Sequence, residues 1–194
     1  MWAHGRANDL LFRMRLRSQA HSVASAVHAL GIERIKPPNG DINHPAFCAQ
    51  LAAGGPDLVV CAFSQRAEES FVQTARVGCL NVHFSLLPEH RGREPSFRAM
   101  LSGKGAGVSV HWMAHELDAG AVVLQRPFDV TGCTTLHNAI LRACHVAAQL
   151  VPDAIRKAAR WQGAKHQLGP RLPVGGWPSQ HETARFREKG FRFA

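Results

Sequence analysis

The sequence of 194 residues contains no long hydrophobic run. Its longest apolar stretches, such as DLVVCAF at residues 57–63, have the length of a strand, whereas a membrane-spanning helix needs about 20 apolar residues. The chain also lacks the long apolar segment near its start that a secretory signal requires. We therefore expect no transmembrane helix, no membrane partner and a cytoplasmic location.

Cysteine pairs are missing as well. The five cysteines form no Cys-x-x-Cys motif and are odd in number, so we predict reduced, mostly buried thiols, as in a cytoplasmic protein. The twelve histidines show no spacing typical of metal ligands. His111 and His115 are four residues apart, but they fall across a predicted strand-to-loop junction. The sequence therefore predicts no metal site.

Acidic residues are few. Asp and Glu number 14 against 23 Lys and Arg, which gives a net charge of +9 with neutral histidines. Such an excess favours anionic partners: phosphorylated small molecules, polyanionic cofactors or nucleic acid. Because the basic residues are spread along the chain, a solvated basic surface is an equally good interpretation.

Helix and strand patterns alternate along the sequence, which predicts an α/β fold with a parallel sheet and flanking helices. A proline within the last helix, Pro152, is expected to kink or divide it. The predicted strands cover 32–36, 57–63, 78–85, 107–113 and 121–130. The predicted helices cover 20–30, 44–55, 67–77, 94–103 and a long segment from the caps Thr134 or Thr135 to Ala158.

The segment CLNVHFSLLPEH at 79–90 places Asn81 and His83 two residues apart in an apolar strand. Their side chains share one face at the carboxyl end of the strand, where ligands bind in open α/β sheets. A carboxamide can donate to an oxyanion, and a carboxylate from the loop HELDAG can hold the tautomer of His83. A structural histidine is the commoner role, so the spacing by itself leaves both interpretations open.

The stretch from Leu80 to Gln125 resembles the core of the folate-dependent formyltransferases, which include glycinamide ribonucleotide, methionyl-tRNA and sugar N-formyltransferases and formyltetrahydrofolate hydrolase. The resemblance implies a Rossmann-like, mostly parallel sheet flanked by helices. It rests on an Asn-x-His-x-Ser-Leu-Leu-Pro motif, a Gly-x-x-Pro loop and a Leu-Asp-x-Gly loop. The matching residues are Asn81, His83, Ser85, Leu86, Leu87, Pro88, Gly92, Pro95, Leu117, Asp118 and Gly120.

By this resemblance, Asn81, His83 and Asp118 form a catalytic trio that needs no metal. An amine attacks the formyl carbon carried on N10 of tetrahydrofolate. Asn81 and protonated His83 then stabilise the tetrahedral oxyanion. Asp118 raises the pKa of His83 and assists the transfer of the proton from the amine to the leaving nitrogen.

The resemblance also implies where the co-substrate 10-formyltetrahydrofolate binds: in a pocket formed largely by the backbone of two loops. Arg91 and Arg93 are candidates to bind an anionic amine acceptor, with solvated loop charges as the alternative. Phe63 serves equally well as a core residue. The expected folate-binding residues are Ala62, Phe63, Ser64, Gln65, Ala114, His115, Glu116 and Leu117.

The family's usual first strand and glycine loop are not recognisable, and residues 1–19 form an atypical basic start. We expect an N-terminally shortened catalytic domain at 1–163 and a tail at 164–194 packed on its surface. The tail resembles the ending of stand-alone formyltransferase-like proteins, in which an aromatic-proline stretch precedes a short basic helix. A native start upstream of Met1, or a second copy of the chain that completes the sheet, would account for the shortening.

The expected function is N-formyl transfer from 10-formyltetrahydrofolate to a small anionic amine, as part of one-carbon metabolism. Two alternatives stay open. The same trio with water as acceptor would give a formyltetrahydrofolate hydrolase. A shortened, non-catalytic relic would bind folate or a partner; nucleic acid is the partner we expect least.

Overall fold

A computed structural model describes residues 23–165 and 172–194. The chain divides into two compact units, residues 1–40 and 41–194. The first contains helix α2 (Val23–Ala29) and the short 3-10 turn η1 (Pro38–Gly40). The basic start at 1–19 lies outside the described residues. The predicted strand at 32–36 was wrong, because these residues adopt neither helix nor strand.

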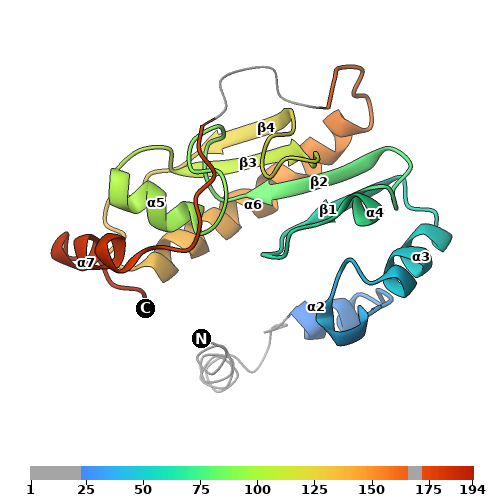
Figure 1. The fold of residues 1–194 in the computed structure, drawn as a ribbon, viewed down its shortest axis with the longest axis horizontal. Helices are drawn as coiled ribbons and strands as arrows, with labels where there is room; N and C mark the ends of the chain where they lie inside the picture. The colour runs from blue at the N-terminus through green and yellow to red at the C-terminus, as the bar shows by residue number, and fades with distance from the viewer. Residues whose placement is uncertain (1–22, 166–171) are drawn as a thin grey trace. The chain divides into compact units, whose positions relative to one another are not determined.

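The second unit is built on a four-stranded sheet of order β1-β2-β3-β4 (Figure 1). With helices flanking the sheet, the predicted Rossmann-like α/β fold is confirmed. Parallel pairing is confined to β1 and β2, since β2–β3 and β3–β4 are antiparallel. The short loop between β3 and β4 closes a hairpin, which only antiparallel strands allow. The strands are β1 (Leu58–Cys61), β2 (Gly78–His83), β3 (Gly107–Trp112) and β4 (Val122–Pro127).

The helices of the second unit match the predicted ones in number and order. Only α4 is much shorter than its predicted range of 67–77, because the N–H groups of Arg76 and Val77 donate to the carbonyls of Pro56 and Asp57 instead of continuing the helix. The helices are α3 (Pro45–Ala53), α4 (Glu69–Val72), α5 (Pro95–Ser102), α6 (Leu136–Ala158) and α7 (Gln180–Glu188).

Helix α6 covers one face of β3 and β4 (Figure 1). The Thr135 side chain caps it by accepting from Asn138 N–H, as predicted. Pro152 does not divide the helix: it lies on the exposed side, where water can satisfy the carbonyl that loses its partner. Small side chains on the opposite side let α6 approach the sheet, and the core between them contains Leu80, Val108, Val110, Trp112, Val123, Ala143, Ala147, Leu150, Ala154 and Ala158.

The tail packs against helix α5 through a second, aromatic core. Phe186 of α7 is fully buried and packs 4.6 Å from Phe97 of α5, measured between ring centroids. Ser179 and Glu182 form a capping box at the start of α7, so the short helix expected in the tail is present. The tail is thereby held against α5.

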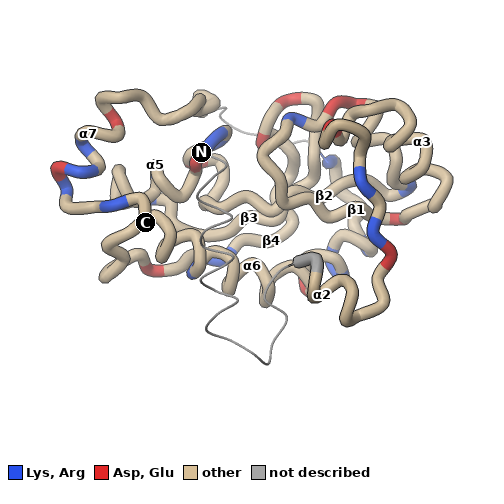
Figure 2. Tube along the Cα trace, turned by 90° about the horizontal axis from the view of Figure 1, so that it is seen from below, with Lys and Arg blue, Asp and Glu red and all other residues tan. Residues whose placement is uncertain are grey.

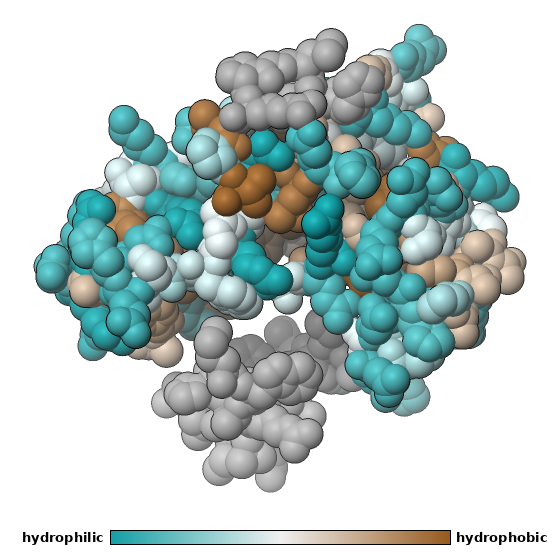
Figure 3. Space-filling view, viewed as in Figure 1, coloured by the Kyte–Doolittle hydropathy of each residue, from teal (hydrophilic) through white to brown (hydrophobic). Residues whose placement is uncertain are grey.

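The surface is polar and its charge is dispersed. Lys and Arg lie at separate places along the described chain, interspersed with Asp and Glu (Figure 2). Hydrophilic side chains cover most of the visible face, and hydrophobic ones gather in a few patches (Figure 3). No described helix combines the length and apolarity needed to cross a bilayer. Four of the five free thiols are buried, as predicted, and Cys144 is exposed.

Candidate active site

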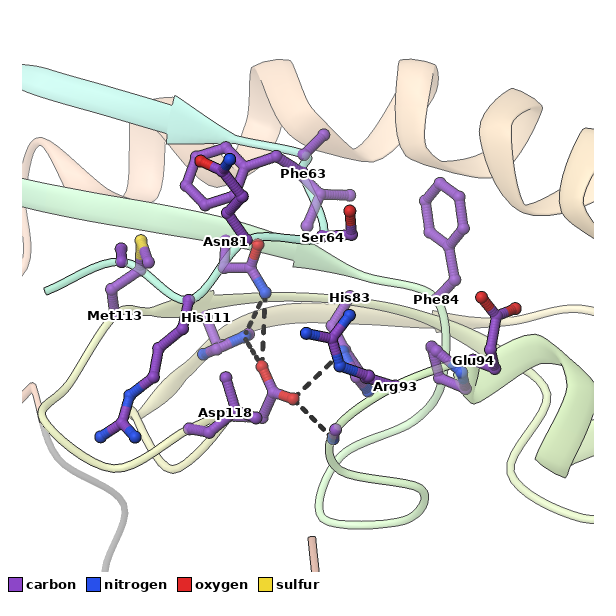
Figure 4. Close-up of a pocket in the computed structure, with 18 of the residues that line it drawn as sticks. Phe63, Ser64, Asn81, His83, Phe84, Arg93, Glu94, His111, Met113 and Asp118 are labelled. Atoms are coloured by element: carbon purple, nitrogen blue, oxygen red, sulfur yellow. Dashed lines mark hydrogen bonds and ion pairs between the residues drawn. The ribbon is translucent and has the colours of Figure 1, made fainter. Parts of the chain in front are cut away.

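Asn81 and His83 lie at the carboxyl end of β2, and Asp118 lies in the loop between β3 and β4. The fold brings the three together. Asp118 Oδ2 is 3.6 Å from His83 Nδ1, and Asp118 Oδ1 is 3.4 Å from Asn81 Nδ2 (Figure 4). His83 is 5% exposed and Asp118 7%, so their charges are poorly screened by water.

The position of Asp118 is set by two loops. Its Oδ2 accepts a hydrogen bond of 2.7 Å from the backbone N–H of Gly92, in the loop after β2. Its own backbone has a positive φ of 50°, which turns the side chain back toward the sheet. The neighbouring Leu117 carbonyl accepts two hydrogen bonds from Arg91, from Nε at 3.2 Å and Nη2 at 2.6 Å. The carboxylate is therefore preorganised.

The environment of His83 favours a neutral ring. Its Nε2 is 3.0 Å from the carbonyl of His90, and a carbonyl can only accept, so Nε2 carries the hydrogen and Nδ1 faces Asp118. Burial lowers the pKa of His83, and this outweighs the raising effect of Asp118. Asp118 thus acts on the pKa in the expected direction, but the net shift is downward.

The carboxyl of Asp118 stays ionised in this environment. Burial raises its pKa, but the neighbouring imidazoles of His111 and His83 and the hydrogen bond from the Gly92 N–H lower it by more, and the net shift is downward. A neutral imidazole beside a carboxylate is the pairing that a proton acceptor needs, because the carboxylate stabilises the imidazolium once it forms.

His111 also belongs to the site, although the sequence analysis considered it only as a metal ligand. It pairs with Asn81 across β2 and β3, and its Nε2 is 3.1 Å from Asn81 Nδ2 and 3.6 Å from Asp118 Oδ1. Because its Nδ1 donates to the Trp112 carbonyl at 2.8 Å, its Nε2 accepts from Asn81. The signal was present: Ser109 and His111 alternate in an apolar strand, as Asn81 and His83 do.

A cavity of about 380 Å³ lies beside these residues. All of the trio line it, as do His111 and Arg93. Most of the predicted folate-binding residues also line it, namely Ala62, Phe63, Ser64, Gln65, Ala114, His115 and Leu117.

Two of the predicted binding residues do not line the cavity. Glu116 is exposed on the loop before Asp118, outside the cavity lining. Arg91 is only 4% exposed, and its guanidinium donates to the carbonyls of Leu117 and Leu172, the latter at 3.0 Å. Of the two predicted acceptor-binding arginines, only Arg93 faces the cavity.

The sequence did not predict that the tail contributes to the cavity. Trp177, which lies ahead of α7, is part of the lining.

Metal ligands are not evident, since no three His, Cys, Asp or Glu side chains within residues 23–165 and 172–194 are arranged to hold a metal ion.

Comparison with known proteins identifies the family of this chain. A family model described as Formyl transferase matches residues 14–155. The chain belongs to the formyl transferase family. The resemblance noted in the sequence is thereby confirmed, and the family and fold support transferase activity.

Solved structures share the fold of this chain. Glycinamide ribonucleotide transformylase 1 from Symbiobacterium toebii has a TM-score of 0.64 and 24% identity, over 79% of this chain and 77% of its own. A sugar N-formyltransferase from Shewanella sp FDAARGOS_354 has a TM-score of 0.61 and 21% identity, over 90% of this chain and 69% of its own. A third structure is PseJ from Anoxybacillus kamchatkensis, solved in complex with UDP-4,6-dideoxy-4-formamido-L-AltNAc and tetrahydrofolate. It has a TM-score of 0.53 and 19% identity, and the match covers 68% of this chain and 69% of PseJ.

Proposed function

We propose that this protein transfers the formyl group of 10-formyltetrahydrofolate to the amine of a small, anionic acceptor. The observation that carries the proposal is the Asp118 carboxyl lying 3.6 Å from His83 and 3.4 Å from the Asn81 carboxamide at the wall of one cavity. The buried thiols are in keeping with a cytoplasmic enzyme.

The residues of the cavity fit a folate co-substrate. The loops at 62–65 and 114–118 line the cavity together and offer backbone donors and acceptors, which suit the polar edge of a planar heterocycle. The similar PseJ was solved with tetrahydrofolate. When bound, 10-formyltetrahydrofolate would supply the activated formyl carbon.

The chain's own residues then have distinct roles. As the amine nitrogen bonds to the formyl carbon, neutral His83 accepts a proton from that nitrogen, and Asp118 stabilises the imidazolium. The Asn81 N–H that reaches Asp118 over 3.4 Å turns to the oxyanion, and the charge of protonated His83 stabilises the oxyanion further. The carbon–N10 bond then breaks, and His83 returns the proton to N10, so that a formamide and tetrahydrofolate leave. Arg93 on the cavity wall favours an anionic acceptor.

The decisive experiment uses the purified full chain. Incubation with 10-formyltetrahydrofolate and a panel of amino sugars, their phosphates and their nucleotide derivatives should give a formylated amine by mass spectrometry and tetrahydrofolate in equal amount. Formate in place of the amide, at the same rate with and without amines, would assign the hydrolase instead.

The non-catalytic alternative is tested by donor binding. A stable analogue of 10-formyltetrahydrofolate should bind the folded protein in calorimetry. Failure of the analogue to bind would refute both enzymatic functions, and binding with no turnover on any acceptor, water included, would favour the relic.

A further inference from the structure

Ser109 lies on β3 directly opposite His83 of β2 and Gln125 of β4, so the three side chains form one row on the same face of the sheet. This face is turned away from the core under α6, because the neighbours of Ser109 on β3, Val108 and Val110, point into that core. Ser109 is fully buried but does not line the cavity. A buried hydroxyl needs hydrogen-bond partners, and these show what Ser109 does beside His83.

The Ser109 hydroxyl holds the loop that follows β2, residues 85–90. It donates to the Ser85 carbonyl at 2.6 Å and accepts from the Leu87 N–H at 2.9 Å. The Gln125 side chain donates to the same hydroxyl at 2.9 Å and to the Leu87 carbonyl at 2.7 Å. The donor and both acceptor positions of the hydroxyl are therefore occupied, and the first half of loop 85–90 is bound to β3 and β4.

The second half of loop 85–90 is held by two further side chains. Ser85 is fully buried and donates to the Glu89 carbonyl at 2.7 Å, which folds the loop back on itself. The His90 ring is anchored on the turn before β3: its Nε2 is 3.0 Å from the Lys104 carbonyl, which can only accept, so Nε2 donates. The backbone of His90 has a φ of 53°, which non-glycine residues rarely adopt, and these contacts hold it there.

The loop directs the His90 carbonyl at His83. A neutral imidazole carries one hydrogen, and two acceptors compete for it: the His90 carbonyl, 3.0 Å from Nε2, and the Asp118 carboxylate, 3.6 Å from Nδ1. The carbonyl holds the hydrogen on Nε2 only while the loop keeps it in place. If the loop moves, Asp118 draws the hydrogen to Nδ1, which can then no longer accept a proton.

We propose that Ser109 and His90 are positioning residues that set the tautomer of His83 through loop 85–90. They keep the hydrogen on Nε2 and leave Nδ1 to accept the proton of the attacking amine. This inference rests on the proposed formyl transfer, in which His83 is the proton acceptor. Neither residue lines the cavity, so both act through His83 and not on the substrate.

The tautomer is measured without turnover, by nitrogen NMR of the full chain with isotopically labelled histidine. His83→Asn identifies the signals of His83. The unaltered protein should carry the hydrogen of neutral His83 on Nε2. Ser109→Ala and His90→Phe should shift it toward Nδ1, because each releases one anchor of the loop. His90→Gln keeps a donor for the Lys104 carbonyl and should retain the original tautomer.

The rate of formyl transfer is measured in the same variants. Loss of one anchoring hydrogen bond should lower kcat by about threefold to tenfold, with little change in KM for the donor, and His90→Gln should retain most of kcat. Thr74→Val is the matched control. The Thr74 hydroxyl is also buried and donates to a backbone carbonyl, that of Phe71, at 2.8 Å, but it lies outside the cavity lining and loop 85–90. Its loss should change neither the tautomer nor kcat.

The outcomes separate this inference from the proposed function. If the unaltered protein carries the hydrogen on Nδ1, or if both variants keep it on Nε2, the inference is wrong even where formyl transfer is found. An unchanged kcat beside a shifted tautomer would also overturn it. If Ser109→Ala does not fold, His90→Phe decides, since the His90 side chain is only half-buried. If the tautomer shifts as described but no amine is formylated, the positioning roles stand and the formyl transfer is refuted.

Discussion

The backbone N–H of Gly92 donates to Asp118 Oδ2 over 2.7 Å, which joins the loop after β2 to the loop between β3 and β4. Gly92 has a φ of 95° and forms a parallel bridge with Gly175 of the tail. One glycine thus connects the reacting carboxylate to the segment that carries Trp177. Gly92 is therefore a backbone junction between Asp118 and the tail.

Gly92→Ala should lower the free energy of unfolding by about 2–5 kcal/mol, because the added Cβ strains a left-handed backbone and overpacks the junction. That Cβ would lie 2.9 Å from Gly175 N and closer still to its carbonyl oxygen. Urea denaturation measures the loss. Gly132→Ala is the control: it has a φ of 78° but no atom within 4 Å of the added Cβ, and should lose only about 1–2 kcal/mol. Equal losses would contradict a steric role for the junction.

Removing members of the trio should abolish turnover and preserve the fold. His83→Ala should lower kcat by about 10²- to 10⁴-fold, the range of general acid–base catalysis, and Asn81→Ala by about 10²- to 10³-fold. Single-turnover rates of formyl transfer provide the measurement, with circular dichroism to confirm folding. The exposed His181→Ala on α7 is the control. Retained turnover in His83→Ala would refute the assigned roles.

His111 is expected to act as a positioning residue through Asn81. His111→Phe removes the acceptor 3.1 Å from Asn81 Nδ2, and kcat should fall by about tenfold to a hundredfold while KM for the donor changes little. His111→Gln keeps an acceptor on a side chain of similar reach and should recover most of kcat. A rise in KM alone, or no rescue by Gln, would indicate a merely structural role.

Stability should fall as the pH is lowered below about 6.5, the ordinary value for histidine. Because burial lowers the pKa of His83 in the folded state, the unfolded chain binds more protons in that range, and the free energy of unfolding decreases with decreasing pH. The lowered pKa of Asp118 has the same sign, below its ordinary value of 3.8.

Urea titrations at a series of pH values measure this dependence. The variant His83→Asn should show a weaker decrease between neutral pH and about pH 5, because it removes the group that titrates there. A stability that rises on acidification, or an equal decrease in His83→Asn, would contradict the buried neutral His83.

The sequence by itself predicted most of the local structure, although not the irregular segment at 32–36, and it named the three residues that the fold brings together. Alternation of apolar segments with glycine and proline located the strands, since these patterns follow from backbone geometry within a few residues. Asn81 and His83 could be predicted to share a face because side chains two apart on a strand always do. Their link to Asp118 came from the family motif and not from spacing.

Only the tertiary structure decided which polar residues reach the cavity. Arg91 and Arg93 are two residues apart in the same loop, and the sequence does not distinguish them. The Arg91 guanidinium is buried and donates to backbone carbonyls, whereas Arg93 lines the cavity, because the tail docks at Gly92 between them. His111 joins the site through its register opposite Asn81, and Trp177 arrives from far along the chain. Strand register and tail docking depend on long-range packing, which local patterns do not encode.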